Sequence, residues 1–263
     1  MTLHETQPPP PSQPPDMRPF PGVRWGPLDL AIGVGGVLVM FFLLGTLIIL
    51  PVTETYGEKS AEGLASQAVT VMLWDVGMVL FVYWLARRRG SGWRDLGFRA
   101  PFSHQAVRPR DPWMKLARTC VAAYVASVAI VNVYAVLIRS LGLDEELLPG
   151  QQLGNETFDY TLVVALMGLA VVVAAPVAEE VFFRGFLYGG LRQRFALPVA
   201  ALLSGSLFSL AHGDPGLVLP FTLVGAVLAY AYERTGTLIA SMSTHFTFNA
   251  ISFFILVLIP EAR

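Results

Sequence analysis

The sequence predicts an all-α fold, a polytopic transmembrane helical bundle of about seven to eight helices. The chain of 263 residues is 54% hydrophobic and only 14% charged, whereas about a quarter of the residues in a typical soluble domain are charged. Its apolar residues also gather in long segments, and about 20 apolar residues in a helix cross a bilayer. The lipid bilayer is therefore the expected surrounding, and a net charge of −1 gives no sign of nucleic-acid binding.

Residues 1–28 are expected to form a disordered, proline-rich cytoplasmic tail. This stretch holds nine of the 19 prolines in the chain, and such a composition favours solvated polyproline conformations over a packed structure. The stretch contains no apolar core of signal-peptide length. We therefore expect the first hydrophobic segment to remain in the protein as an uncleaved membrane anchor.

Seven apolar segments follow the tail, and each is predicted to be a transmembrane helix. They lie at 29–51, 66–86, 116–139, 160–192, 197–214, 217–232 and 237–259. The fourth segment is longer than one span requires. We therefore expect Pro176, or the glycines at 185, 189 and 190, to kink or split it. The chain divides into N-terminal transmembrane helices over 29–160 and a C-terminal core over 161–259.

The charges between the segments predict the orientation in the membrane. The connection over 87–115 carries seven arginines and a lysine, whereas the connections near 52–65 and 140–159 carry mostly acids. Short loops rich in Lys and Arg stay on the cytoplasmic side, so we expect a cytoplasmic N-terminus. Residues 260–263 show no eukaryotic retrieval signal, which favours a bacterial plasma membrane.

Two adjacent carboxylates, Glu179 and Glu180, lie within the fourth apolar segment. Charged side chains are costly in the bilayer interior, and those that occur there usually face a polar cavity and serve a function. Glu180 and Arg184 are four residues apart with the acid first, a spacing that favours an ion pair on a helix. Glu179 points about 100° away around the helix. We therefore predict that Glu180 is structural and that Glu179 is available for chemistry.

Three more polar residues, His212, His245 and Asn249, lie within later apolar segments. His212 follows the turn after the fourth segment by as many residues as Glu179 precedes it, so both lie roughly 25 Å along a helical hairpin. His245 lies roughly 15 Å beyond the last turn, and Asn249 shares its helix face because it is four residues further on. We expect the four side chains to line one polar cavity.

Such a set can hydrolyse a peptide bond without a serine or cysteine nucleophile. Glu179 is the predicted general base, because a buried carboxylate can accept a proton near neutral pH, and His212 shares the attacking water. His245 and Asn249 are predicted to donate hydrogen bonds to the developing oxyanion. No cofactor is expected in this mechanism.

Three motifs contain these residues, namely Glu-Glu-x-x-x-Arg at 179–184, Phe-x-x-x-His at 208–212 and His-x-x-x-Asn at 245–249. In this order they resemble the CPBP (CAAX protease and bacteriocin-processing, Abi) family of intramembrane proteases, which includes type 2 CAAX prenyl endopeptidases. The resemblance covers about the last hundred residues. It implies an intramembrane endopeptidase with a catalytic core at 161–259, a membrane-associated peptide substrate that is prenylated or carries a leader, and supporting roles for Glu180 and Arg184. Phe208 lies four residues before His212 on the same helix face, and this spacing predicts that it supports the imidazole.

Three other functions stay open. A zinc-dependent metalloprotease would bind Zn²⁺ through Glu179, His212 and His245, although the sequence has no His-Glu-x-x-His helix, and we favour the metal-free route. A transporter would use the same polar residues as an ion path, but inverted-repeat transporters show two similar halves, which this chain lacks. A membrane immunity or scaffold protein without catalysis is the third.

Asp75 is an isolated carboxylate in the second apolar segment. We expect it to form a buried hydrogen bond with a neighbouring helix. A proton or ion site is the alternative, because ionisable residues inside a membrane are often functional.

Overall fold

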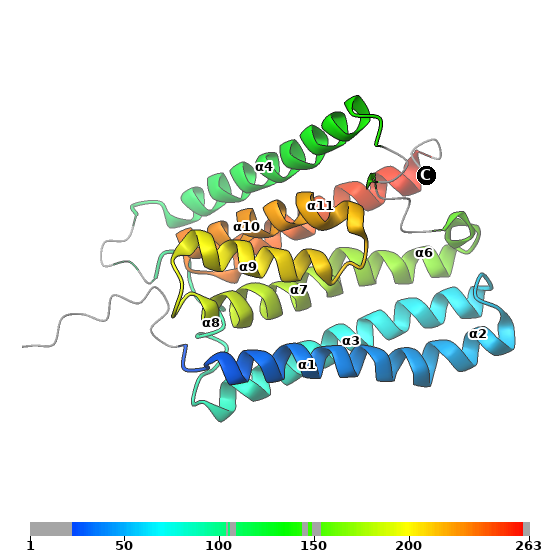
Figure 1. Cartoon of the computed structure of the whole chain (residues 1–263), viewed down its shortest axis with the longest axis horizontal. Coiled ribbons are helices and arrows are strands. Elements are labelled where there is room, and N and C mark those ends of the chain that lie inside the picture. The colour runs from blue at the N-terminus through cyan, green and yellow to red at the C-terminus, as the bar shows by residue number, and fades with distance from the viewer. Residues whose placement is uncertain (1–22, 104, 106–108, 144–146, 149–153, 260–263) are drawn as a thin grey trace, which may run out of the picture.

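The computed structural model describes residues 23–103, 105, 109–143, 147–148 and 154–259. Nearly all of the predicted tail over 1–28 therefore lies outside the described residues. The described part is helical and contains no strand, which confirms the predicted all-α polytopic bundle. Its helices lie roughly side by side along the longest axis of the molecule (Figure 1).

Six helical runs are long and apolar enough to cross a membrane, and they match six of the predicted segments. They are Pro27–Tyr56, Ala61–Arg88, Pro112–Ser140, Thr161–Leu191, Pro215–Thr235 and Leu238–Leu258. The predicted segment 197–214 instead forms a shorter helix, α9 (Leu197–Leu210), of 14 residues. Because 14 residues reach about 21 Å and the hydrocarbon core is about 30 Å thick, α9 is too short to cross the bilayer as the sequence predicted.

The first two runs form one side of the bundle. The first contains α1 (Pro27–Leu44), a π-helical segment η1 (Gly45–Ile49) and α2 (Leu50–Tyr56), and the second is α3 (Ala61–Arg88). Arg89 at the end of α3 forms an ion pair of 2.8 Å with Asp29 at the start of α1. This pair joins the two antiparallel helices at the end of the bundle where the chain enters it.

The fourth run is one continuous helical rod in which α-helical and π-helical turns alternate. Its parts are α6 (Thr161–Gly168), η3 (Leu169–Ala174), α7 (Ala175–Glu179), η4 (Glu180–Tyr188) and α8 (Gly189–Leu191). The expected split at Pro176 or at the glycines does not occur. A proline cannot donate its backbone nitrogen, and here a widened π turn comes immediately before it. Such turns frequently accompany functional sites.

The last helices pack against this rod. They are α9, a short 3₁₀ turn η5 (Pro215–Leu217), α10 (Val218–Thr235) and α11 (Leu238–Leu258). A second 3₁₀ turn, η2 (Asn155–Asp159), lies earlier in the chain, before α6. Helix α4 (Pro112–Ser140) lies on the opposite side of the bundle from α1 (Figure 1). The backbones of α9 and α10 approach closely, since a Cβ atom on Gly225 would lie 2.6 Å from the Cα of Gly205.

Basic side chains gather at one end of the bundle. The first residues of α1 and α4 and the last residues of α3, α8 and α10 all lie at this end (Figure 1). They carry Arg24, Arg87, Arg88, Arg89, Lys115, Arg118, Arg192 and Arg234. The opposite end carries mostly acids, and Lys59 there pairs with Glu156. The cytoplasmic location of the basic end stays a prediction.

Candidate active site

The ion pair expected between Glu180 and Arg184 is present and completely buried. Arg184 Nη1 donates to Glu180 Oε1 at 2.8 Å, and both side chains are 0% exposed. The second terminal nitrogen, Nη2, donates to the carbonyl of Gly225 in α10 at 3.2 Å, and the guanidinium lies 4.5 Å from the ring centroid of Phe208 in α9. Buried charges need such compensation. Arg184 therefore connects η4 with α9 and α10.

His245 lies between the two glutamates. Its Nδ1 is 3.0 Å from Glu180 Oε1, and its Nε2 is 3.8 Å from Glu179 Oε2. Because the Glu180 carboxylate is paired with Arg184, it can only accept, so the hydrogen on the imidazole resides on Nδ1. A neutral His245 then presents an unprotonated Nε2 to Glu179. The expected oxyanion role of His245 consequently requires that Nε2 first take up a proton.

Glu179 differs from Glu180 in its pairing and in its exposure. The Oε2 atoms of both side chains are buried without a hydrogen-bond partner among the described residues, but only Glu180 has its other oxygen, Oε1, paired with Arg184. The Glu179 side chain retains 17% exposure, whereas that of Glu180 has none. The free oxygen of Glu179 is therefore placed to accept a proton from a bound water.

Asp75 in α3 does not form the interhelical hydrogen bond that the sequence suggested. Its side chain is only 2% exposed, and neither carboxylate oxygen has a hydrogen-bond partner in the described part of the chain. The carboxylate lies within electrostatic reach of Glu179. Helix α3 packs against α7, which ends at Glu179. A third carboxyl group therefore lies near the candidate base.

His212 is fixed by Phe208, as their spacing predicted. Its Nδ1 lies 2.8 Å from the carbonyl oxygen of Phe208. A carbonyl only accepts, so Nδ1 carries the hydrogen and Nε2 is left free. The ring of Phe208 lies 4.8 Å from the His212 ring and 5.7 Å from the His245 ring, and Phe221 of α10 packs against His212 at 4.8 Å. Both histidines are therefore held with a free Nε2.

Asn249 is anchored by a bond that the π-helical turn creates. In a π turn such as η3, each backbone N–H bonds to the carbonyl of the residue five positions earlier, as the N–H of Ala175 does to the carbonyl of Ala170. The donor for Val171 would be residue 176, which is a proline and has no N–H. Asn249 Nδ2 donates to this carbonyl at 2.9 Å. One amide hydrogen of Asn249 is thereby committed, and the other remains for a ligand.

Three of the four predicted catalytic residues line one small cavity. It has a volume of about 40 Å³ and lies between α4, α9, α10 and α11. His212, His245 and Asn249 line it, together with Ser127, Phe208 and Phe221. Glu179 is not in its wall but adjoins it through His245. Most of the lining is apolar, but the two histidines and Asn249 give a water molecule polar partners there, and a space of this size has room for a few waters.

The alternative zinc site fits only partly. Metal-binding histidines usually donate their second ring nitrogen to a carbonyl or carboxylate, and Phe208 and Glu180 act as such acceptors here. However, no three His, Cys, Asp or Glu side chains in the described part of the chain converge closely enough to hold one metal ion. The side chains as placed do not form the predicted ligand set of Glu179, His212 and His245.

Two contacts of the site were not predictable from residue types. The carbonyls of Val171 and Gly225 hold Asn249 and Arg184, and any residue supplies a carbonyl. The only sequence signal was Pro176, whose missing N–H leaves an acceptor free in a helix.

Comparison with known proteins agrees with the motifs. Residues 161–251 match the family described as type II CAAX prenyl endopeptidase Rce1-like. A Bacillus subtilis protein named "Putative membrane peptidase YdiL" is 29% identical over 91 residues, which are 35% of this chain and 37% of that protein. The chain therefore aligns with little more than a third of this curated relative. No solved structure gives a significant match. The matches confirm the family resemblance drawn from the three motifs.

Proposed function

We propose, from the resemblance of residues 161–251 to Rce1-like endopeptidases, that this protein is an intramembrane endopeptidase. It hydrolyses a peptide bond near the cytosolic end of a membrane-associated peptide, with Glu179 as general base. The observation that carries the proposal is the position of His245, 3.0 Å from Glu180 and 3.8 Å from Glu179. It stands at the wall of a water-sized cavity that His212 and Asn249 also line.

The reaction starts with a water molecule held by the free Nε2 of His212. Glu179 Oε2 removes a proton from this water while the water oxygen attacks the carbonyl carbon of the substrate. The proton passes to His245 Nε2 once the gap of 3.8 Å closes by a side-chain rotation. His245 becomes an imidazolium, which the Glu180 carboxylate at Nδ1 stabilises.

The oxyanion forms next to two donors. The second amide hydrogen of Asn249 and the new Nε2–H of His245 bond to it. The tetrahedral intermediate then collapses, the C–N bond breaks, and the proton on His245 returns to the departing amine. A carboxylic acid and an amine leave, and His245 regains the tautomer with its hydrogen on Nδ1.

A neighbouring groove suits an apolar substrate. It has a volume of about 330 Å³ and lies between α1, α3, η4 and α9. Phe182 and Phe183, two and three residues after Glu180, form part of its wall along with Trp74 and Met78. A lipid-modified or strongly hydrophobic segment bound there would lie beside the glutamates. This geometry supports a prenylated or leader peptide as the substrate class.

The proposal is tested by comparing membrane peptides from cells that express wild-type protein or Glu179→Gln. Cleavage products are expected in the wild type and absent from the variant. Glu62→Gln is the matched control, because it makes the same chemical change at an exposed acid at the far end of α3, and it should behave as the wild type. Products that persist in Glu179→Ala would reject the proposal.

Purified protein then tests the route with the substrate found. Asn249→Ala is expected to bind substrate normally and to turn over about a hundredfold more slowly or worse, the usual loss for one oxyanion donor. Chelation and metal-free dialysis are expected to leave activity intact. Loss of activity followed by rescue with stoichiometric Zn²⁺ would instead make Glu179, His212 and His245 metal ligands.

A further inference from the structure

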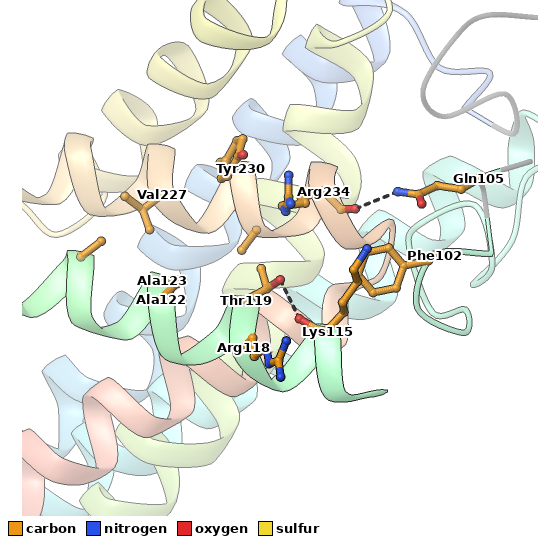
Figure 2. A pocket seen from close by; sticks show the side chains of 12 residues that line it. Phe102, Gln105, Lys115, Arg118, Thr119, Ala122, Ala123, Val227, Tyr230 and Arg234 are labelled. Carbon is orange, nitrogen blue, oxygen red and sulfur yellow. Dashed lines mark hydrogen bonds between the residues drawn. The ribbon is translucent and has the colours of Figure 1, made fainter. Parts of the chain in front are cut away.

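A second cavity, larger and separate from the candidate active site, lies between α4 and α10 at the basic end of the bundle. Its volume is about 710 Å³, within the range of pockets that bind small molecules. Small apolar side chains form its walls, among them Ala122, Ala123 and Val227. Figure 2 shows Lys115 and Arg234 on the two helices that border it.

Three cationic side chains line the mouth of this cavity. Lys115, Arg118 and Arg234 are exposed, and none of them forms an ion pair with another described residue. The side-chain amide of Gln105 donates a hydrogen bond of 3.4 Å to the backbone carbonyl of Arg234, and this bond does not involve the Arg234 guanidinium (Figure 2). Asp111, one turn before Lys115, borders a small hollow together with Lys115 and Arg118 but forms no ion pair with a described residue. Glu233, next to Arg234 in sequence, pairs with Arg192 instead. The mouth therefore carries a net positive charge.

A separate cavity lies further along the same two helices, away from the charges. It has a volume of about 350 Å³ and is bordered by Ile130 and Val133 of α4 and by Leu219 and Leu223 of α10. Its lining is apolar, apart from the ring of Tyr134. The two cavities follow one another along α4 and α10, and together they are called the α4–α10 groove, which has a cationic end and an apolar length. This shape and charge pattern match an anionic amphiphile.

We propose that the α4–α10 groove binds an anionic phospholipid, with the phosphate at Lys115, Arg118 and Arg234 and an acyl chain along the apolar walls. Basic residues at the cytoplasmic membrane surface attract anionic lipids of that leaflet, and the charge distribution predicts this end to be cytoplasmic. The groove opens toward the lipid, since Tyr230 at its edge is 48% exposed.

A peptide is the weaker occupant of this groove. A peptide backbone brings N–H and C=O groups that need hydrogen-bond partners when they leave water. The alanine and valine side chains of the larger cavity provide none, and neither do the aliphatic walls of the cavity beyond it. An acyl chain needs no such partners. Charge complementarity and the apolar walls therefore both favour a lipid.

The lipid site does not depend on the proposed peptidase function. Ser127 belongs to the wall of the candidate active-site cavity, whereas Ala122, Ala123 and Ala126 of the same helix face the groove. Lipid binding is consequently expected to be the same in Glu179→Gln as in the wild type. A failure of one proposal is thus distinguishable from a failure of the other.

Native mass spectrometry of the full-length protein in detergent tests the site, with dioleoylphosphatidylglycerol and dioleoylphosphatidylcholine as probes. The wild type is expected to retain one phosphatidylglycerol with at least about a tenfold preference over phosphatidylcholine. The triple variant Lys115→Gln/Arg118→Gln/Arg234→Gln should lose this preference. Ala122→Phe, which fills the groove and keeps every charge, should weaken the binding of phosphatidylglycerol as well.

The matched control removes the same number of charges at the same end of the bundle. Arg87, Arg94 and Arg194 are exposed and lie outside the groove lining, so their triple glutamine variant should retain the lipid. An equal loss in this control would overturn the proposal, because surface charge in general would then explain binding. Unchanged binding in Ala122→Phe would overturn it too. Preference for a peptide with a free carboxyl terminus over its amidated form, without lipid selectivity, would assign the groove to a peptide.

Discussion

The side-chain amide of Asn249 donates a hydrogen bond to the backbone carbonyl of Val171, 2.9 Å away on another helix. The carbonyl is available because the N–H that would pair with it in the π turn belongs to position 176, which is a proline. A proline far from Asn249 in sequence thus determines where one candidate oxyanion donor is held.

The first prediction concerns this proline. Pro176→Ala supplies an N–H that competes with Asn249 for the Val171 carbonyl, so the amide loses its anchor. We expect turnover to fall by about tenfold or more, since small displacements of positioning groups cost large rate factors, while thermal stability in detergent is retained. Pro51→Ala is the control, because Pro51 follows the π turn Gly45–Ile49 in the same way without a catalytic residue nearby. Full activity in Pro176→Ala would contradict the coupling.

The two glutamates should respond differently to the same change. Glu180→Gln leaves Arg184 as an unpaired charge that is 0% exposed, and such a loss costs about 3–5 kcal/mol. Glu179→Gln removes no hydrogen bond, because Glu179 Oε2 has none among the described residues, so it should stay folded and be inactive. Thermal unfolding in detergent and peptidase activity measure the two effects. Equal losses of stability would show that this division is wrong.

His245 offers a test of which ring nitrogen serves which glutamate. The amide of His245→Asn can replace Nδ1 and keep the bond to Glu180, whereas that of His245→Gln reaches toward the position of Nε2. Both variants should be inactive, because neither carries a proton as imidazole does. Only His245→Asn should retain nearly the wild-type melting temperature. A more stable His245→Gln would indicate that the contact at 3.0 Å is not the anchoring one.

Asp75 is predicted to lower the stability of the folded protein and to support its activity. A buried polar group without a partner costs about 1–3 kcal/mol, and both Asp75 oxygens are in this state among the described residues. Asp75→Leu should therefore raise the melting temperature, because it removes the unpartnered polar group, and lower activity, because it removes the carboxyl group within electrostatic reach of Glu179. Thr70→Val is a matched control on the same helix, where the buried hydroxyl also has no partner in the described part. It should stabilise the protein without a change in activity.

The membrane-spanning helices were predictable because each consists of a long run of apolar residues, which can be recognised from the amino-acid composition of the segment alone. The observed run Leu238–Leu258, for example, lies within the predicted 237–259. Helix α9 was predicted too long, since Ala211 and His212 are no longer helical although the sequence stays apolar as far as Ala211. Hydropathy reports burial in lipid and does not report where a backbone turns.

The candidate site was predictable to the extent that its residues follow helix spacing. Glu180 and Arg184 are four apart and pair as expected, and so do Phe208 and His212. The bridge from His245 to Glu180 joins residues 65 positions apart, and it depends on how α11 rotates against η4. No local pattern contains that rotation. The position of Asp75 beside Glu179 was missed for the same reason.

The Glu180–Arg184 pair also has a consequence for how the chain is made. During synthesis the rod Thr161–Leu191 is complete before α10 and α11 exist, so Gly225 and His245 are not yet present to receive its charged groups. Because both charges of the pair belong to the same helix at adjacent turns, they neutralise each other within the nascent segment. The rod can therefore enter the bilayer with a neutral Glu180–Arg184 pair and with Glu179 as its one remaining charge. Inserting three separate ions would cost far more free energy. The later helices then find a preassembled polar pair around which to dock.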